Sequence, residues 1–189
     1  MDKQNLLDEL YAPYKNCQLC PLAQLGRTQV VFGSGNPNAT LMLIGEGPGE
    51  QEDKQGLPFV GRSGQLLTKI LNALSIEKKE LYITNIVKCR PPNNRTPLAD
   101  EVSSCKKILL NEQIRIIQPK VICTLGASAY NALFTTNTQG ITKLRGKFIE
   151  FEGIQLLPAL HPSYTLRNPK EIKTLTLDLE LAYRTSLSS

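Results

Sequence analysis

The sequence predicts an α/β fold, a three-layer α/β/α sandwich around a central, mostly parallel four-stranded sheet. Four short apolar runs have the composition of strands that are buried on both faces. Segments with helical periodicity lie between these runs, and alternating strands and helices are typical of βαβ units. The chain has 189 residues and no internal repeat, so we expect one domain over residues 1–189. The predicted strands are Thr40–Ile44, Leu81–Val87, Lys120–Leu125 and Gln155–Leu160.

The helical segments are recognised by where their apolar residues recur. Gly64–Leu74 places four leucines and an isoleucine on one face. A longer helix is predicted from Thr96 to about Ile117, with Pro97 in its first turn. Gln29–Phe32 is a candidate for an added edge strand. The other predicted helices are Lys3–Tyr14, Gly126–Phe134 and Pro169–Tyr183.

Composition and charge narrow the class of protein. Hydrophobic residues make up 41% and charged residues 21% of the chain, which argues against intrinsic disorder. No apolar run approaches the ~20 residues of a membrane span, and the N-terminus lacks a signal-peptide core. We therefore expect a soluble cytoplasmic protein without a membrane partner, and a monomer by default. The net charge of +5 permits an anionic partner but is equally compatible with an ordinary solvated surface.

The five cysteines fall into distinct settings. Their odd number, without a signal peptide, argues against a disulfide framework. Cys123 lies in an apolar run and is expected to be an inert buried thiol. Cys17 and Cys20 form a C-x-x-C knuckle, and 15 residues separate Cys89 from Cys105. Four thiolates can bind an iron–sulfur cluster or Zn²⁺, and from spacing alone a cluster, zinc and no metal all stay open. A thioredoxin-like redox role is less favoured, because the knuckle follows a helix instead of a strand.

In parallel sheets, ligands bind beyond the carboxyl ends of the strands. The first predicted strand runs into the glycine-rich turn Gly45–Gly49, which exposes main-chain groups but is not a Walker A sequence. The second contains Asn85, and the fourth is followed by His161, the only histidine. At that edge His161 can donate a hydrogen bond to a developing anion, although a lone histidine is more often structural. Phe59, in a loop between Pro58 and Gly61, either stacks on a ligand ring or caps the core.

Taken together, these motifs resemble those of family 4 uracil-DNA glycosylases, the iron–sulfur branch of that superfamily. The resemblance covers about residues 15–170, and the joint occurrence of the motifs is far more specific than any one of them. The matching stretches are Gly45–Asp53, Gly56–Arg62, Thr84–Pro97, Leu160–Ser163 and the four spaced cysteines.

The resemblance implies an enzyme that flips uracil out of single- or double-stranded DNA and hydrolyses its N-glycosidic bond, which initiates base excision repair. It implies that Phe59 stacks on uracil, that Asn85 reads O4 and N3–H, and that His161 faces O2. Glu46, the nearest carboxylate, is implied to support the reaction. The implied substrate-binding set is Glu46, Gly47, Pro48, Gly49, Phe59, Asn85 and His161, with Glu46 and His161 catalytic. The implied ligands of a [4Fe–4S] cluster, joining the N-terminal flank to segment 89–105, are Cys17, Cys20, Cys89 and Cys105.

Basic residues in loops are the expected contacts to DNA phosphates. Arg62 either joins them or pairs with Glu50 or Asp53. Tyr164 and Leu166 are candidates for a wedge that presses into the minor groove as the base leaves. The phosphate candidates are Lys88, Arg90, Arg95, Arg145, Lys147 and Arg167.

Three other functions remain open at this point. A non-enzymatic iron–sulfur module would share the cysteines and basic loops but would not need Glu46, Asn85 and His161 at one edge. A zinc-stabilised enzyme acting on a small nucleotide would lack the brown colour of a cluster. A related glycosylase would release hypoxanthine or xanthine in place of uracil.

Overall fold

The computed structural model describes residues 2–134 and 139–188, which contain one six-stranded sheet of order β1-β3-β2-β4-β6-β5. The inner pairs β3–β2, β2–β4 and β4–β6 are parallel, which confirms the α/β class and the mostly parallel sheet. The two edge strands are antiparallel to their neighbours and bring the number of strands from the expected four to six. The strands are β1 (Ser34–Gly35), β2 (Leu41–Gly45), β3 (Tyr82–Asn85), β4 (Val121–Leu125), β5 (Ile149–Phe151) and β6 (Ile154–Ala159).

The edges of the sheet differ from the prediction. Gln29–Phe32 is not a strand, although the main-chain N–H of Val31 donates to the Lys88 oxygen at 2.7 Å. The edge strand β1 begins two residues later and pairs with β3. On the opposite edge, β5 and β6 form a hairpin whose turn residues, Glu152 and Gly153, both have positive φ. Two-residue turns of that handedness match the twist of a hairpin.

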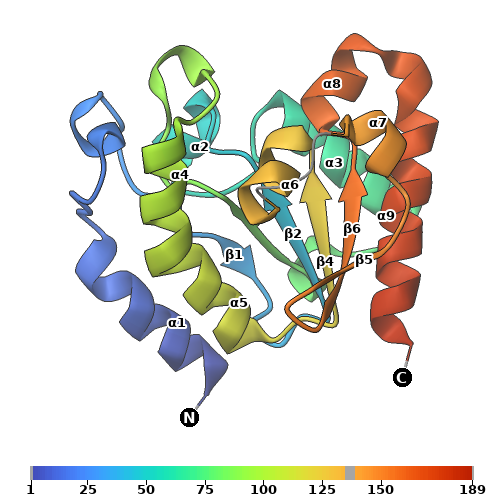
Figure 1. The fold of residues 1–189 in the computed structure, drawn as a ribbon, viewed down its shortest axis with the longest axis horizontal. Helices are drawn as coiled ribbons and strands as arrows, with labels where there is room; N and C mark the ends of the chain where they lie inside the picture. The colour runs from blue at the N-terminus through green and yellow to red at the C-terminus, as the bar shows by residue number, and fades with distance from the viewer. Residues whose placement is uncertain (1, 135–138, 189) are drawn as a thin grey trace.

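Helices cover both faces of the sheet, as expected for three layers. Figure 1 shows the strands between α4 and α5 on one side and α9 on the other. The α-helices are α1 (Lys3–Tyr11), α2 (Glu50–Gln55), α3 (Arg62–Ala73), α4 (Ala99–Cys105), α5 (Asn111–Ile117), α6 (Ala127–Leu133), α7 (Ile141–Leu144), α8 (Pro162–Arg167) and α9 (Ile172–Leu187). Short 3₁₀ turns are η1 (Ala12–Tyr14), η2 (Pro21–Gln24), η3 (Lys78–Glu80), η4 (Pro92–Asn94) and η6 (Pro169–Glu171).

Alternate residues along each central strand enter two separate cores. Met42 and Ile44 pack with residues of α1, α5 and α6, whereas Leu41 and Leu43 pack with residues of α3 and α9. Burial on both faces explains why these strands read as continuous apolar runs.

The long helix predicted from Thr96 to Ile117 is interrupted. It begins at Ala99, and a π-helical turn, η5 (Lys106–Leu110), separates α4 from α5. Such a turn places one extra residue in the helix, and it follows directly after Cys105. No described helix is long and apolar enough to cross a membrane.

Candidate active site

The carboxyl ends of the parallel strands meet at one edge of the sheet, where their arrowheads point toward α8 in Figure 1. Gly45 at the end of β2 is paired with Asn85 at the end of β3. A cavity of about 320 Å³ opens at this edge, and all seven predicted substrate-binding residues line it. Its lining includes Glu46, Gly47, Pro48, Gly49, Phe59, Asn85 and His161.

Gly45 allows two of these side chains to meet at the floor of the cavity. A Cβ at Gly45 would lie 2.4 Å from Asn85 Oδ1 and 2.5 Å from Phe59 Cζ. Both distances are shorter than any real Cβ contact, so a side chain here would displace the amide or the ring. The absence of a side chain at position 45 therefore lets Asn85 and Phe59 share one small site.

Phe59 has a backbone φ of 52°, a left-handed conformation that costs energy for a non-glycine residue. Contacts on both sides hold it there. Lys78 Nζ donates to the Phe59 main-chain oxygen at 2.9 Å, and Glu52 accepts from the N–H groups of Val60 and Gly61 at 2.9 and 2.7 Å. A Cβ at Gly64 would lie 2.0 Å from the Phe59 oxygen, so α3 also approaches this loop closely. The ring is thereby fixed at the cavity before any ligand arrives.

His161 is the N-cap of α8, and this position determines its tautomer. The main-chain N–H of Ser163 donates to His161 Nδ1 at 3.0 Å, so Nδ1 carries no proton. The Ser163 hydroxyl lies 2.7 Å from the same nitrogen. Burial, together with the charge of Arg167, lowers the pKa of His161 to about 4. The neutral ring therefore carries its proton on Nε2, which is left to serve as a donor.

Asn85 is 2% exposed, and its main chain is tied to a buried lysine. Lys88 Nζ donates to the Asn85 carbonyl oxygen, to Thr84 Oγ1 and to Gln113 Oε1, at 2.7, 2.6 and 2.6 Å. Within residues 2–134 and 139–188 no group hydrogen-bonds to the side-chain amide of Asn85, which is therefore available to a ligand. The expectation that Lys88 contacts phosphate is wrong, because the residue is 1% exposed and its ammonium has three internal acceptors.

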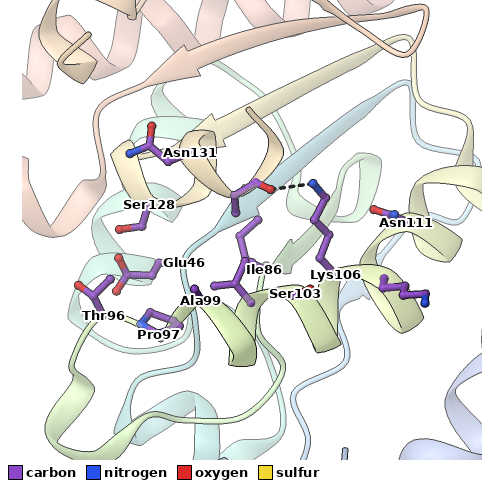
Figure 2. Close-up of a pocket in the computed structure, with 13 residues that line it drawn as sticks. Glu46, Ile86, Thr96, Pro97, Ala99, Ser103, Lys106, Asn111, Ser128 and Asn131 are labelled. Atoms are coloured by element: carbon purple, nitrogen blue, oxygen red, sulfur yellow. Dashed lines mark hydrogen bonds between the residues drawn. The ribbon is translucent and has the colours of Figure 1, made fainter. Parts of the chain in front are cut away.

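Glu46 follows β2 directly and lines the active-site cavity and two neighbouring cavities. Its main-chain oxygen accepts from the N–H of Val87 at 3.2 Å, which holds the start of the glycine-rich turn against the chain after β3. Figure 2 shows its carboxylate between Ser128 and Thr96, at one end of a larger cavity, called the side cavity below. The lining of the side cavity is Glu46, Ile86, Thr96, Pro97, Ala99, Val102, Ser103, Lys106, Lys107, Asn111, Ser128, Asn131 and Ala132.

Comparisons with known proteins show the family of the chain. Residues 32–182 match the model of the uracil DNA glycosylase superfamily. The chain belongs to this superfamily. It is 46% identical over 183 residues to a type-4 uracil-DNA glycosylase of Thermotoga maritima, which covers 95% of this chain and 94% of the relative. Type-4 enzymes of Sulfurisphaera tokodaii and Saccharolobus solfataricus are each 42% identical, over 92% and 91% of this chain and 82% of each relative.

Four cysteines of this superfamily member lie around one small cavity. Cys17, Cys20, Cys89 and Cys105 all line it, although they come from three separate segments of the chain. Arg27 donates to Cys89 Sγ at 2.8 Å. Burial raises the pKa of the Cys105 thiol to about 12. Among the described residues, no three His, Cys, Asp or Glu side chains are grouped tightly enough to hold a single metal ion.

The remaining cysteine and the acidic residue Asp53 have structural positions. Cys123 is buried in the core beneath α3 and α9, as the sequence predicts. Asp53, 2% exposed, accepts from the main-chain N–H groups of Thr28 and Gln29 at 2.9 and 3.4 Å. It therefore ties the cysteine-bearing N-terminal flank to α2 and does not pair with Arg62.

The other phosphate candidates divide into two groups. Arg95 makes a two-pronged ion pair with Glu101, which is fully buried, and Arg145 pairs with Asp178, which is 1% exposed. Both arginines therefore have structural roles, although Arg95 also lines the active-site cavity. Arg167 lines the same cavity beside His161, and Arg90 and Lys147 lie outside it.

Sequence reasoning missed several residues of the active-site cavity. These are Glu52, Ser63, Pro91, Asn94 and Ser163. Glu52 lies within the matching stretch Gly45–Asp53, but its partners are eight and nine residues away across a loop. Ser163 follows His161 by two residues, the spacing at which a main-chain N–H reaches the side chain of an N-cap residue. This spacing is the one local signal that could have predicted the contact.

Proposed function

We propose that this protein is a uracil-DNA glycosylase that uses the active-site cavity to bind an extruded uracil and hydrolyse its N-glycosidic bond, the first step of base excision repair. The observation that carries the proposal is the convergence of a fixed aromatic ring, an unpaired buried amide and a neutral imidazole donor on one cavity. These three groups are Phe59, Asn85 and His161. The relatives named type-4 uracil-DNA glycosylase support the same activity.

Base recognition follows from the amide and the ring. Uracil presents an oxygen acceptor at C4 and an N–H donor at N3, and a carboxamide such as that of Asn85 pairs with both. Cytosine presents the opposite order, so it leaves buried polar groups unpaired in the same position. A site built around polar pairing rejects such an analogue strongly. Phe59 supplies the face on which the base stacks, at about 1–3 kcal/mol per base.

The chemistry requires that charge be stabilised on both sides of the breaking bond. As the bond from C1′ to N1 lengthens, negative charge spreads over the uracil ring and positive charge over the sugar. In this proposal His161 Nε2–H donates to O2 of the departing base, a contact worth about 3–4 kcal/mol in comparable sites. Glu46 stabilises the cationic sugar. Water then adds to C1′ and loses a proton, the uracil anion takes up a proton, and the products are free uracil and an abasic deoxyribose.

The DNA must deliver its base to this cavity, because uracil within a duplex is out of reach. Arg90, Lys147 and Arg167 are the proposed phosphate contacts. Tyr164, 37% exposed on α8, is a wedge candidate together with Leu166. The proposal also takes the protein to act as a cytoplasmic monomer on single- or double-stranded DNA.

Release of uracil is tested by incubating the protein with a uracil-containing oligonucleotide, followed by alkali to cleave the abasic product. We expect cleavage at uracil only. If the uracil strand is not cleaved, the proposal is disproved. If hypoxanthine or xanthine is released instead of uracil, the protein is a glycosylase for that other deaminated base.

We further propose that the cysteine cavity binds a [4Fe–4S] cluster. Four cysteines line one cavity, and four thiolates are the usual ligands of such a cluster. Two N–H donors directed at sulfur, from Arg27 and from the Lys88 main chain at 3.3 Å to Cys105, suit thiolate ligands. When bound, the cluster would cross-link the N-terminal flank to segment 89–105 and stabilise the fold.

Cysteine replacements test this cluster. Cys89→Ala or Cys17→Ala is expected to lose the brown colour, most of the bound iron and much of the stability, since metal-site affinity contributes to folding. Cys123→Ala is the matched control, because that thiol is buried like Cys89 but lies in the other core. Iron content that depends on Cys123 and not on Cys105 would refute the ligand set.

A further inference from the structure

The side cavity is larger than the active-site cavity and has no role in the mechanism above. Its volume is about 560 Å³. Figure 2 shows it between α6 on one side and α4 on the other, with Ile86 at its floor. Pro97, Ala99 and Val102 add apolar surface, whereas most of the rim consists of uncharged polar groups. An apolar floor with a rim of amides and hydroxyls is typical of sites for small flat rings.

The side cavity neighbours the active site. A third cavity shares Glu46, Thr96 and Ser128 with it, and shares Glu46, His161 and Ser163 with the active-site cavity. Glu46 therefore lines all three cavities, so the side cavity lies next to the active site.

The charge at the far side of the cavity suits a phosphate-bearing ligand. The π-helical turn η5 carries Lys106 and Lys107, and both line the cavity. Lys106 Nζ donates to the Ala132 main-chain oxygen at 2.8 Å, a contact that links η5 to α6 and leaves two of the ammonium protons for another acceptor (Figure 2). Lys107 is exposed.

We propose that the side cavity binds the nucleobase of the nucleotide next to the target uridine in the same DNA strand. This inference rests on the proposed function and extends its substrate from one base to a dinucleotide. The polymer that reaches the active site carries a second flat, hydrogen-bonding ring one phosphate away. That ring matches the apolar floor and neutral polar rim, and the lysines match the phosphate that follows it. An unstacked base is held between apolar side chains in the same manner as a flipped one.

The test compares substrates with and without the neighbouring bases. One single-stranded oligonucleotide carries uracil between normal nucleotides, and the other carries it between two abasic spacers. For the wild-type protein we expect kcat/KM to be about tenfold lower on the spacer substrate, equivalent to about 1.4 kcal/mol. Cleavage of the spacer substrate itself reports on the proposed function, whatever happens to the side cavity.

A variant that fills the cavity completes the test. Asn131→Trp places a large side chain on α6, at a residue that lines the side cavity and does not line the cysteine cavity. We expect about a tenfold loss on the normal substrate and an unchanged rate on the spacer substrate, so that the variant no longer distinguishes the two. Ser103→Trp, on the facing helix, is a second variant with the same expectation once its iron content is verified. Asn72→Trp is the matched control, an exposed helical asparagine that lies outside the three neighbouring cavities.

Two outcomes would overturn the inference. One is a wild-type protein that cleaves both substrates equally well. The other is a loss in Asn131→Trp of the same size on both substrates, which would indicate damage to the active site instead of a lost contact. Failure of the wild type on both substrates would instead reject the proposed function.

Discussion

Lys88 Nζ lies 2.7 Å from the main-chain oxygen of Asn85, inside the protein and away from solvent. The same residue donates its main-chain N–H to Cys105 Sγ at 3.3 Å. One lysine therefore joins the cysteine cavity to the residue proposed to read uracil. Its third and fourth partners, Thr84 and Gln113, come from β3 and α5.

Lys88→Met should destabilise the protein, because three buried acceptors would lose their donor. Each unsatisfied buried polar group costs about 1–3 kcal/mol. The free energy of unfolding, measured by urea denaturation with iron content verified, is expected to fall by at least that amount. Lys143→Met, a change of an exposed lysine on α7, should leave it unaltered. Equal stability of the two variants would contradict the role of the Lys88 network.

His161→Ala is expected to slow single-turnover cleavage of uracil DNA by about 10²–10³-fold, the usual effect of removing one oxyanion donor. DNA affinity should hardly change, because the proposed phosphate contacts are made by other residues, Arg90, Lys147 and Arg167. His161→Asn should recover part of the rate, since its amide still donates. Rapid-quench rates and binding anisotropy measured side by side distinguish the roles: a loss confined to affinity would make His161 a binding residue only.

The pH dependence of stability should also report on His161, the only histidine of the chain. Its pKa is about 4 in the folded protein and about 6.5 when unfolded, so between these values the unfolded state binds the additional proton. Stability is therefore full above pH 6.5 and falls toward pH 4, by up to about 1.4 kcal/mol per pH unit. As the pH falls from 6.5 to 4, the free energy of unfolding of the wild type should therefore decrease more than that of His161→Asn. Parallel urea midpoints of the two proteins would show that the folded pKa is not lowered.

Gly45→Ala should damage the active site without touching any catalytic group. The added methyl would displace Asn85 Oδ1 or the Phe59 ring, and a misplacement of about 1 Å can cost about 10²-fold in rate. We expect a loss of that order in uracil release. Gly140→Ala is the control, because its Cβ would meet only Thr142 Oγ1, at 3.9 Å. Wild-type activity in Gly45→Ala would mean that the two side chains are not held as described.

Salt dependence separates DNA contacts from structural arginines. Arg167→Ala, Arg90→Ala and Lys147→Ala should each flatten the plot of log affinity against log salt concentration by about one unit. Arg145→Ala should leave that slope unchanged and lower stability instead, because it strips the partner from buried Asp178. The measurement is anisotropy of an uncleavable DNA at several salt concentrations. A flatter slope in Arg145→Ala would mean that Arg145 contacts DNA phosphates after all.

Much of the fold and of the active site follows from the sequence. The four central strands lie where their apolar runs predict them, because strands buried on both faces have near-continuous apolar sequences. The seven predicted active-site residues share one cavity, because strand ends and the turns that follow them are local features. The edge strands were less predictable: β1 has two residues, and its pairing depends on a neighbour almost fifty residues away.

The chemistry at the strand ends, the family motifs and the burial of Cys123 could be predicted from the sequence, since each depends on residue type and near neighbours. Which charged side chains pair with internal partners became clear from the folded structure alone. Lys88, Arg95 and Arg145 look alike as basic residues in polar segments, yet each is consumed by a partner 6 to 33 residues away. The role of Glu52 in holding the Phe59 loop is likewise visible only from its contacts with the N–H groups of Val60 and Gly61. A buried charged group is stable only with an internal partner. Because burial depends on the whole fold, no local pattern of residues predicts which charged groups are paired in this way.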